Sequence, residues 1–372
     1  MSEWTETELG EISEVQTGPF GSQLKNEQYV TGGTPVITVE HIQDFKIKNF
    51  NYPSVTNEDK IRLSKYLLKE GDIIFTRVGS VDLSAFVKPE QDGWMFSSRM
   101  LRVRPDKTKV DSRFLSYYFQ QPKFREYILN ISVGATMPSI NTGILKGIPI
   151  SYPLLSVQRA IAKLLTSFDD KIDLLHRQNA SLEAMAETLF RQWFVVEVKE
   201  DWKVGKVEDL FILQRGFDLP IQNRIEGIHP IFAASGFSGG HIEFKVKAPG
   251  VTTGRSGLLG KVFLVMDDFW PLNTSLFIKE FRLGTPVFSY FILKHIDLES
   301  FNAGSAVPTL NRNHVHESEA IIPPQDLIKK FETLVYPNYQ KIKKNQAQIH
   351  SLTILRDTLL PKLMSGEVRV KM

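Results

Sequence analysis

The sequence predicts an α+β protein in which two α+β domains are separated by two long antiparallel helices that form an intramolecular coiled coil. Three observations lead to this fold class. Parts of the chain recur at a fixed distance, each repeat ends in a long heptad pattern, and the remaining segments mix short strand and short helix patterns. A chain of 372 residues is long enough for two domains with cores of their own.

The internal repeat is visible at two places. The segment WTETELGEISEVQTG from Trp4 resembles WKVGKVEDLFILQRG from Trp202, and GATMPSIN from Gly134 resembles GSAVPTLN from Gly304. The offset is 198 residues at the first place and 170 at the second, and it stays at 170 through the heptads that follow. We therefore expect a first domain at 1–152, a first helix at 153–196, a second domain at 197–322, and a second helix with the C-terminal tail at 323–372.

Each predicted long helix carries a narrow apolar seam with alternating spacings of four and three residues, which is typical of a coiled coil. Pro153 and Pro323-Pro324 stand just before the helices, where proline is tolerated. Asparagine within the seam indicates a fixed register between the helices. The alternative is that each helix packs only on its own domain. The seam residues are Ile161, Leu165, Phe168, Ile172, Leu175, Asn179, Leu182 and Leu189 in the first helix, and Phe331, Val335, Ile342, Asn345, Ile349, Leu352, Leu359 and Leu363 in the second.

The two domains show mixed patterns. Strands are predicted at 73–75, 100–104, 261–265 and 276–278, because turn residues precede or follow short runs rich in β-branched and apolar residues. Short helices are predicted at 112–119 and 287–295. The stretches 234–240 and 252–260, rich in Gly, Ser and Thr, predict loops.

Composition and missing motifs exclude several classes of protein. With no Cys, the chain has no disulfide, thiolate metal site or cysteine nucleophile, which suits a cytoplasmic protein. The longest apolar runs are too short for a membrane span, and the N-terminus is too polar for a signal peptide. Residues 254–262 fail as a phosphate loop, since Val262 replaces the Ser or Thr that would hold magnesium. His314 and His316 could share a strand face, but a third metal ligand is missing, and Asp169-Asp170 and Asp267-Asp268 are expected at solvated ends of elements.

Local clusters of basic residues leave nucleic-acid binding as a function to consider, although a net charge of +3 is too small for binding by bulk charge. Arg and Lys can hold phosphates, and Arg can read guanine in the major groove. The candidate DNA-binding residues are Lys46, Lys48, Arg62, Lys65, Arg77, Arg99, Arg215, Arg224, Lys245, Lys247, Arg255 and Lys261. Arg99 belongs to a cluster that also contains Arg102, Arg104, Lys107, Lys109 and Arg113. Such clusters are more often simply solvated surface.

Several motifs, taken together and in order, carry a resemblance to a known family. They are GDIIFTRVG at 71–79, GATMPSIN at 134–141, QRAIA at 158–162 and LFRQWF at 189–194, with partial repeats in the second half. On these motifs the chain resembles the specificity (S) subunit of type I restriction-modification enzymes. One departure is TGRSG at 253–257, which stands where the first half has FTRVG without a preceding GDII, so the second domain could belong to a different subtype.

The resemblance implies two target-recognition domains, each reading one half of a split site on double-stranded DNA. The paired helices would set the gap between the half-sites and dock the methyltransferase and restriction (translocase) subunits. The chain itself would be non-catalytic and would bind no cofactor or metal, because the partner subunits bring adenosylmethionine, ATP and magnesium. Two alternatives remain open at this point: a coiled-coil scaffold that does not bind DNA, and a DNA-acting nuclease with an unrecognised active site.

Overall fold

The computed structural model describes residues 4–48, 50–134, 136–302 and 307–371. Of the motif residues named above, Ala135 and Gly304 to Ala306 lie outside the described residues. The chain folds into two compact units. The first unit comprises residues 1–172 and 351–372, and the second comprises residues 173–350. The two long helices are therefore divided between the units, whereas the boundaries expected from the sequence assign each helix to a part of its own.

The first unit is built around a four-stranded antiparallel sheet with the order β2-β10-β7-β8. A three-stranded sheet with the order β6-β3-β9 and the two-residue strands β4 and β5 complete its strand content, and β1 pairs with β11 where the domain begins and ends. The strands are β1 (Thr5–Glu8), β2 (Ser13–Thr17), β3 (Thr34–Ile37), β4 (Ile42–Gln43), β5 (Lys46–Ile47), β6 (Ser54–Val55), β7 (Ile73–Thr76), β8 (Ser84–Phe86), β9 (Met95–Phe96), β10 (Met100–Pro105) and β11 (Pro149–Tyr152). The helices are α1 (Leu9–Ile12), α2 (Asn57–Arg62), α3 (Ser112–Gln120), α4 (Pro122–Ile131), α5 (Thr142–Lys146) and the start of α6 (Leu155–Arg191).

The second unit repeats this arrangement except for the β4–β5 pair, which has no counterpart among its described strands. Its four-stranded sheet has the order β13-β19-β16-β17, its three-stranded sheet has the order β15-β14-β18, and β12 pairs with β20. The strands are β12 (Lys203–Lys206), β13 (Phe211–Arg215), β14 (His229–Ala233), β15 (Gly236–His241), β16 (Gly250–Gly254), β17 (Val262–Val265), β18 (Trp270–Pro271), β19 (Ser275–Phe281) and β20 (Glu319–Ile322). The helices are the rest of α6 from residue 173, α7 (Val207–Leu210), α8 (Pro286–His295), α9 (Arg312–Glu317) and most of α10 (Gln325–Met364).

The shared topology settles how the two domains are related. In each unit the three-stranded sheet contains one short parallel pair, β3 with β9 or β14 with β18. The remaining strand pairs are antiparallel. The departure at 253–257 is therefore a change of side chains on the same framework of strands, and nothing in the strand order marks the second domain as a different fold.

Two predicted loops are in part strands. Residues 236–240 belong to β15 and residues 252–254 to β16. The reason is close backbone approach: a Cβ atom added to Gly240 would lie 2.1 Å from the carbonyl oxygen of Gly227, and one added to Gly254 would lie 1.8 Å from that of Leu258. Glycine here permits tight packing of extended segments and does not mark a loop.

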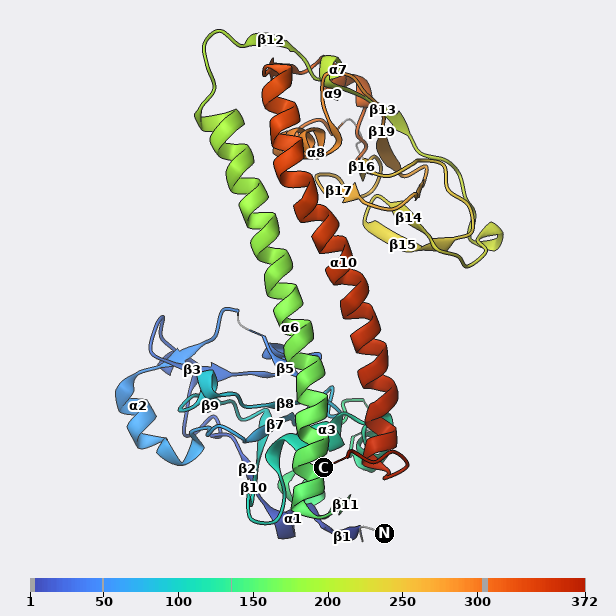
Figure 1. Ribbon diagram of the computed structural model, residues 1–372. Helices are drawn as coiled ribbons and strands as arrows, with labels where there is room; N and C mark the ends of the chain where they lie inside the picture. Colours follow the sequence, from blue (N-terminus) through green and yellow to red (C-terminus); the bar gives the residue numbers. More distant parts are fainter. Residues whose placement is uncertain (1–3, 49, 135, 303–306, 372) are drawn as a thin grey trace. The chain divides into compact units, whose positions relative to one another are not determined.

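The predicted long helices are continuous, with 37 residues in α6 and 40 in α10 (Figure 1). In the first unit, Arg356 of α10 lies 2.6 Å from Asp169 of α6, while Leu360 and Leu363 share a core with Ile161. Because later residues of α10 meet earlier residues of α6, the helices run antiparallel there.

The same direction of pairing holds in the second unit, where Asn345 pairs with Asn179 and Phe331 with Phe190. All sixteen seam residues are buried or half-buried. With its two α+β units and this helix pair, the chain confirms the predicted fold class.

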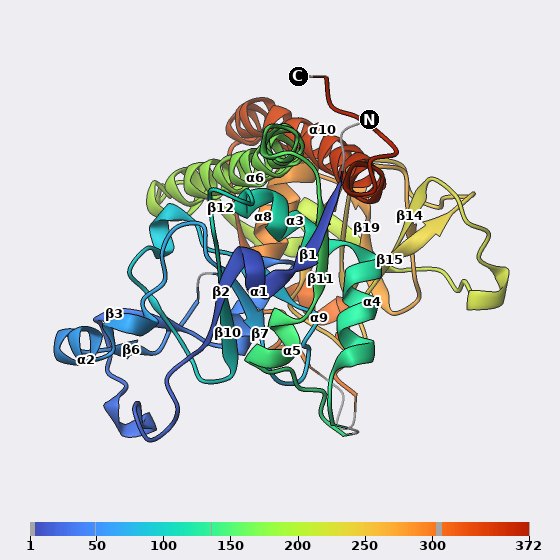
Figure 2. The same cartoon turned by 90° about the horizontal axis from the view of Figure 1, so that it is seen from below.

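The C-terminal tail returns to the start of the first domain (Figure 2). Val368 and Val370 pack against the first core together with Trp4, and a Cβ atom added to Gly366 would lie 2.9 Å from the Trp4 indole nitrogen. The tail after α10 is therefore part of the first unit.

Candidate nucleic-acid interface

The clearest candidate site in the first unit is the loop Arg77-Val78-Gly79, which follows the central strand β7. The backbone of Arg77 is fixed on both sides. Its N–H donates to the Arg99 carbonyl, and its own carbonyl accepts from the Ile140 N–H at 3.0 Å. Gly79 has a φ of 85° and donates its N–H to Pro138 at 2.9 Å. The loop is thus held against the segment 138–140, which is the PSI part of the GATMPSIN motif.

The second unit contains the same loop, Arg255-Ser256-Gly257, after the equivalent strand β16. The Arg255 carbonyl accepts from Leu310 at 2.8 Å, and Gly257, with a φ of 93°, donates to Pro308 at 2.9 Å. Each of these contacts has its counterpart in the first unit. The sequence resemblance between the two motif pairs therefore reflects one structural device that occurs twice. We call these two segments the arginine loops.

The arginine loops leave room for another molecule. A Cβ atom added to Gly79 or Gly257 would meet no atom within 4 Å, and the positive φ favours glycine at both positions. Among the residues that the structure describes, the Arg77 guanidinium makes one weak hydrogen bond, from Nη1 to the Ser98 carbonyl at 3.3 Å. Both arginines are half-buried, so each is anchored by its backbone and keeps donors for a base edge or a phosphate.

The other candidates in the first unit are dispersed. Arg99 is exposed beside Arg77. Lys46 lies in β5 and Lys48 directly follows it, and Lys48 Nζ lies 3.3 Å from Asp44. Arg62, at the end of α2, is tied to Asp59 and to the Gln23 carbonyl, so much of its donor capacity is used. Lys65 lies over the ring of Tyr66 at 4.8 Å.

The candidates in the second unit are also dispersed. Arg215 lies 3.8 Å from Asp218, and Arg224 donates to the Ser238 carbonyl at 3.2 Å. Lys261 is exposed at the start of β17, in the hairpin that carries Arg255. Lys245 and Lys247 lie together on one segment and line a pocket with Lys279, a residue that the sequence did not single out. In the sequence, Lys279 could have been found only from its position in strand β19, two residues after Phe277.

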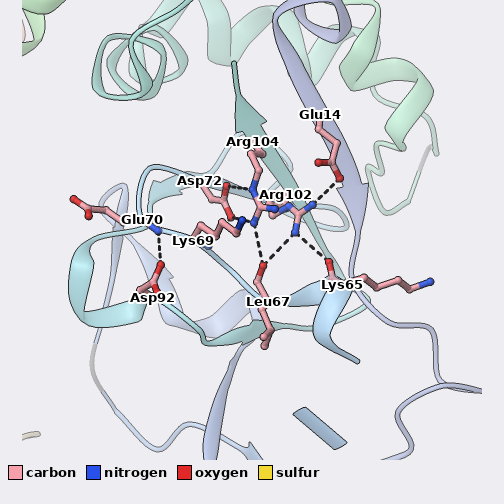
Figure 3. Close-up of polar contacts among 9 residues, drawn as sticks. All are labelled: Glu14, Lys65, Leu67, Lys69, Glu70, Asp72, Asp92, Arg102 and Arg104. Atoms are coloured by element: carbon pink, nitrogen blue, oxygen red, sulfur yellow. Dashed lines mark hydrogen bonds and ion pairs between the residues drawn. The ribbon is translucent and has the colours of Figure 1, made fainter. Parts of the chain in front are cut away.

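Two arginines of the predicted cluster, Arg102 and Arg104, are engaged in ion pairs within the first unit (Figure 3). The Arg102 side chain is 1% exposed and donates to Glu14 at 2.7 Å and to the carbonyls of Lys65 and Leu67. Arg104 forms a bidentate pair with Asp72 at 2.7 and 2.8 Å. Burial lowers the pKa of Arg102, whereas the bond to Asp72 raises the pKa of Arg104. These arginines hold the segment 65–67 against the central sheet, because they bind its backbone carbonyls. Carboxylates that are distant in sequence neutralise their charges.

The histidine and acid pairs also have structural roles. His314 and His316 lie on helix α9 and not on a strand, and His316 Nε2 accepts from the Leu213 N–H at 2.8 Å. Asp169 lies within α6 and accepts from Tyr117 and Arg356, so it is not at the end of an element. Asp267 is exposed between β17 and β18, as expected, and pairs with Lys343. Within the described ranges, no group of three or more His, Asp or Glu residues is placed to hold a metal ion. None of the helices in those ranges is both long and apolar enough to cross a membrane.

Comparisons with known proteins identify the family of the chain. Residues 1–184 match the family described as the type I restriction modification DNA specificity domain. The MjaIX type I restriction enzyme specificity subunit of Methanocaldococcus jannaschii is 26% identical over 414 aligned positions, which cover 99% of this chain and 94% of that protein. The HindI specificity subunit of Haemophilus influenzae is 26% identical over 200 positions, covering 52% of this chain and 41% of that protein.

A solved structure supports the fold. The crystal structure of a type I restriction-modification S subunit from M. genitalium superposes with a TM-score of 0.72 at 18% identity and covers 97% of this chain and 96% of its own. Two α+β units with one topology and equivalent arginine loops define a duplicated fold. The match to the DNA specificity domain and to specificity subunits assigns it to the non-catalytic proteins that recognise DNA. The chain belongs to the specificity subunits of type I restriction-modification systems.

Proposed function

We propose that each α+β domain reads one half of a split site on double-stranded DNA and that the arginine loops lie at the centre of the two contact surfaces. The observation that carries this proposal is the recurrence of one loop with the same backbone contacts, Arg77 on Ile140 and Arg255 on Leu310. A recognition element that occurs once in each copy suits a site with two halves. The other candidate Lys and Arg residues would contribute mainly phosphate contacts.

The long helices would set the distance between the half-sites and would dock the methyltransferase and restriction subunits. Adenosylmethionine, ATP and magnesium would be bound by those partners, and the assembled complex would act in the cytoplasm. The resemblance to specificity subunits supports this part of the proposal, together with the two continuous helices. A scaffold that does not bind DNA and a nuclease with its own active site are not favoured, because the relatives are DNA specificity subunits.

The test uses the purified full-length chain and a fluorescent random duplex of about 40 base pairs. Fluorescence anisotropy at several salt concentrations should give an affinity that falls steeply as salt rises, since phosphate contacts release counterions. Co-expression with the methyltransferase subunit of the same system, followed by sequencing of methylated motifs, should give a two-part motif. A binding curve independent of salt, or a motif in one continuous block, would contradict the proposal.

A further inference from the structure

A pocket of about 380 Å³ opens in the second unit between the segment 245–250 and strands β13 and β19. Three phenylalanines and three lysines contribute to its lining: Phe217, Phe277, Phe281, Lys245, Lys247 and Lys279. The described residues that line it include no aspartate or glutamate. The pocket therefore combines an apolar, aromatic wall with an uncompensated positive charge.

The aromatic wall extends beyond the pocket. The Phe217 ring lies 5.7 Å from that of Phe277 and 6.5 Å from that of Trp270, measured between centroids. Lys245 Nζ lies 4.6 Å from the Trp270 centroid, so one of the cations sits against the same group of rings. Phe217 is half-buried and Phe277 is 4% exposed, so Phe217 offers more of its surface to a ligand.

The equivalent place in the first unit can be located from the strand registers. Arg102 pairs with Gln16 and Ile74, whereas Phe277 pairs with Gln214 and Thr252 at the same positions of the equivalent strands. The same counting places Gly250 at the position of Asp72. A bulge in β19 makes Lys279 an extra residue beside the position of Arg104, because Glu280 pairs with Ile212 where Arg104 pairs with Glu14. Backbone pairing of Leu68 with Trp94, and of Val246 with Phe269, places Lys245 at the position of Leu67 and Lys247 at that of Lys69.

The two copies therefore use one place in the fold differently. In the first unit, Glu14 and Asp72 neutralise the two arginines, and their guanidinium groups bind the Leu67 carbonyl. In the second unit, Ile212 and Gly250 stand in place of the two carboxylates, and no ion pair is found for Lys245, Lys247 or Lys279 among the described residues. The site that is closed by internal ion pairs in one copy is an open cationic pocket in the other.

We propose that this pocket binds a nucleoside phosphate unit, with the base on the Phe217 side and the phosphate among the three lysines. A volume of 380 Å³ lies in the range of small-molecule sites and exceeds what a phosphate group alone would fill. Aromatic rings stack on any base, and lysine ammonium groups form charge-assisted hydrogen bonds with phosphate oxygens. The unit could come from an unstacked nucleotide of a nucleic acid or from a free nucleotide, and only the first source rests on the proposed DNA-binding function.

The experiment uses 2-aminopurine deoxyriboside 5′-monophosphate, whose fluorescence is quenched when the base stacks. The full-length chain should quench the free mononucleotide saturably, or should quench 2-aminopurine placed within a single-stranded oligonucleotide if the pocket takes only a strand. The double variant Lys247→Glu/Lys279→Glu should bind the responsive probe at least about tenfold more weakly, as expected from the loss of two charge-assisted contacts. Both lysines are exposed, so the variant should melt like the wild type.

The matched control is Lys69→Glu, which changes an exposed lysine at the position of Lys247 in the first unit and should leave quenching unchanged. A second variant, Phe217→Leu, should reduce quenching by removing the ring while it keeps the lysines. The pocket assignment fails if neither probe is quenched saturably, or if the double variant titrates like the wild type. Anisotropy with random duplex is run in parallel. Duplex binding without quenching would contradict nucleotide binding in the pocket but would not contradict the proposed function.

Discussion

At the scale of single residues, the surroundings of each arginine decide its role. Arg102 and Arg104 are neutralised by carboxylates and bind backbone carbonyls, so they contribute to the fold. Arg77 and Arg255 are anchored through their backbones, and no ion pair is found for either side chain within the described part of the chain. An arginine with unused donors on a fixed loop suits recognition, because little further ordering is needed when it binds.

The first prediction concerns the arginine loops. Arg77→Ala and Arg255→Ala should each weaken DNA binding by about 1–3 kcal/mol if the side chain reads a base, or reduce the salt slope by about one if it binds a phosphate. Melting temperatures should stay near that of the wild type. Anisotropy with the random duplex measures the contribution of phosphate contacts to the affinity. Sequencing of methylated motifs shows whether the side chain reads a base. The exposed Lys123, changed to Ala, serves as the control, and unchanged affinity and motif in both arginine variants would rule out the assignment.

A second prediction concerns pH and His316. Burial, followed by the charge of Arg312, lowers the pKa of His316, and its Nε2 accepts the Leu213 N–H. The unfolded chain therefore binds a proton more readily than the folded chain does. The neutral His316 therefore contributes to the stability of the folded state at neutral pH. This contribution is lost as pH falls below about 6.5, the ordinary pKa of histidine.

The expected size of the loss is about 1 kcal/mol, the contribution of one backbone hydrogen bond. Urea unfolding between pH 5 and pH 8 measures it by comparing the wild type with His316→Gln, which keeps an acceptor but does not titrate. The difference between the two proteins should change across this range. His41, whose pKa is also lowered by burial, is present in both and cancels. A difference independent of pH would contradict the assignment.

The sequence offered Arg77 and Arg255 as candidates at matching places of FTRVG and TGRSG, but it could not separate Arg102 from a surface arginine. The repeated Arg-x-Gly pattern is local, so two copies in one chain are enough to detect it. The partners of Arg102 and Arg104 come from Glu14 and Asp72, which lie 88 and 32 residues away, and pairing over such distances leaves no local pattern. Lys279 was missed for a similar reason, because its pocket is assembled from three separate segments.

At the scale of elements, the long helices were predictable and the glycine-rich strands were not. A heptad seam is a periodic signal over some 40 residues, so the bounds of α6 and α10 follow from it closely. Strands β15 and β16 contain glycines whose backbone lies so close to another segment that an added Cβ atom would be only about 2 Å from a carbonyl oxygen. Which segment comes this close depends on the fold as a whole. Glycine alone cannot distinguish a loop from a tightly packed strand.

The third prediction concerns the polar layer of the seam. Asn345 Nδ2 donates to Asn179 Oδ1 at 2.7 Å and to Gln178 Oε1 at 2.9 Å. Asn345→Leu should destabilise the chain by about 1–3 kcal/mol, because the buried Asn179 loses its donor. The double variant Asn179→Leu/Asn345→Leu should recover that stability or exceed it, since an apolar layer replaces the polar one.

Urea unfolding of the wild type, both single variants and the double variant completes a thermodynamic cycle for this pair. The exposed Gln346, changed to Leu, is the control for adding an apolar side chain to the same helix. If the two single changes add without a coupling term, the asparagines do not act as a pair, and the register must be fixed by other contacts such as the Asp169–Arg356 bond.

At the scale of the whole molecule, one topology is used twice with different side chains. Arg102 and Phe277 occupy one position of the sheet, as do Asp72 and Gly250, while the loops that carry Arg77 and Arg255 keep the same backbone contacts. The framework that positions the arginine loops is thus constant, and the surface around it differs between the copies. This arrangement suits a protein whose two halves recognise different sequences.

The last prediction tests whether helix length sets the gap between half-sites. Residues 174–180 of α6 and 344–350 of α10 are equivalent heptads at the offset of 170, and they contain the facing pair Asn179 and Asn345. Deleting both heptads keeps the seam pattern and shortens each helix by about 10 Å, the length of about three base pairs. Methylation of the original motif should be lost when the variant is co-expressed with the methyltransferase subunit. Any motif that remains should keep both half-sites with a shorter gap.

The control for this deletion removes only residues 174–180, which breaks the match between the helices. It should reduce stability and abolish methylation, whereas the matched double deletion should still fold and bind random duplex. Methylated-motif sequencing reads the gap directly. If the matched deletion still methylates the original motif with its original gap, the helices do not act as a ruler, and the spacing must be set by the partner subunits or by the DNA, because the seam itself would have been shortened without effect.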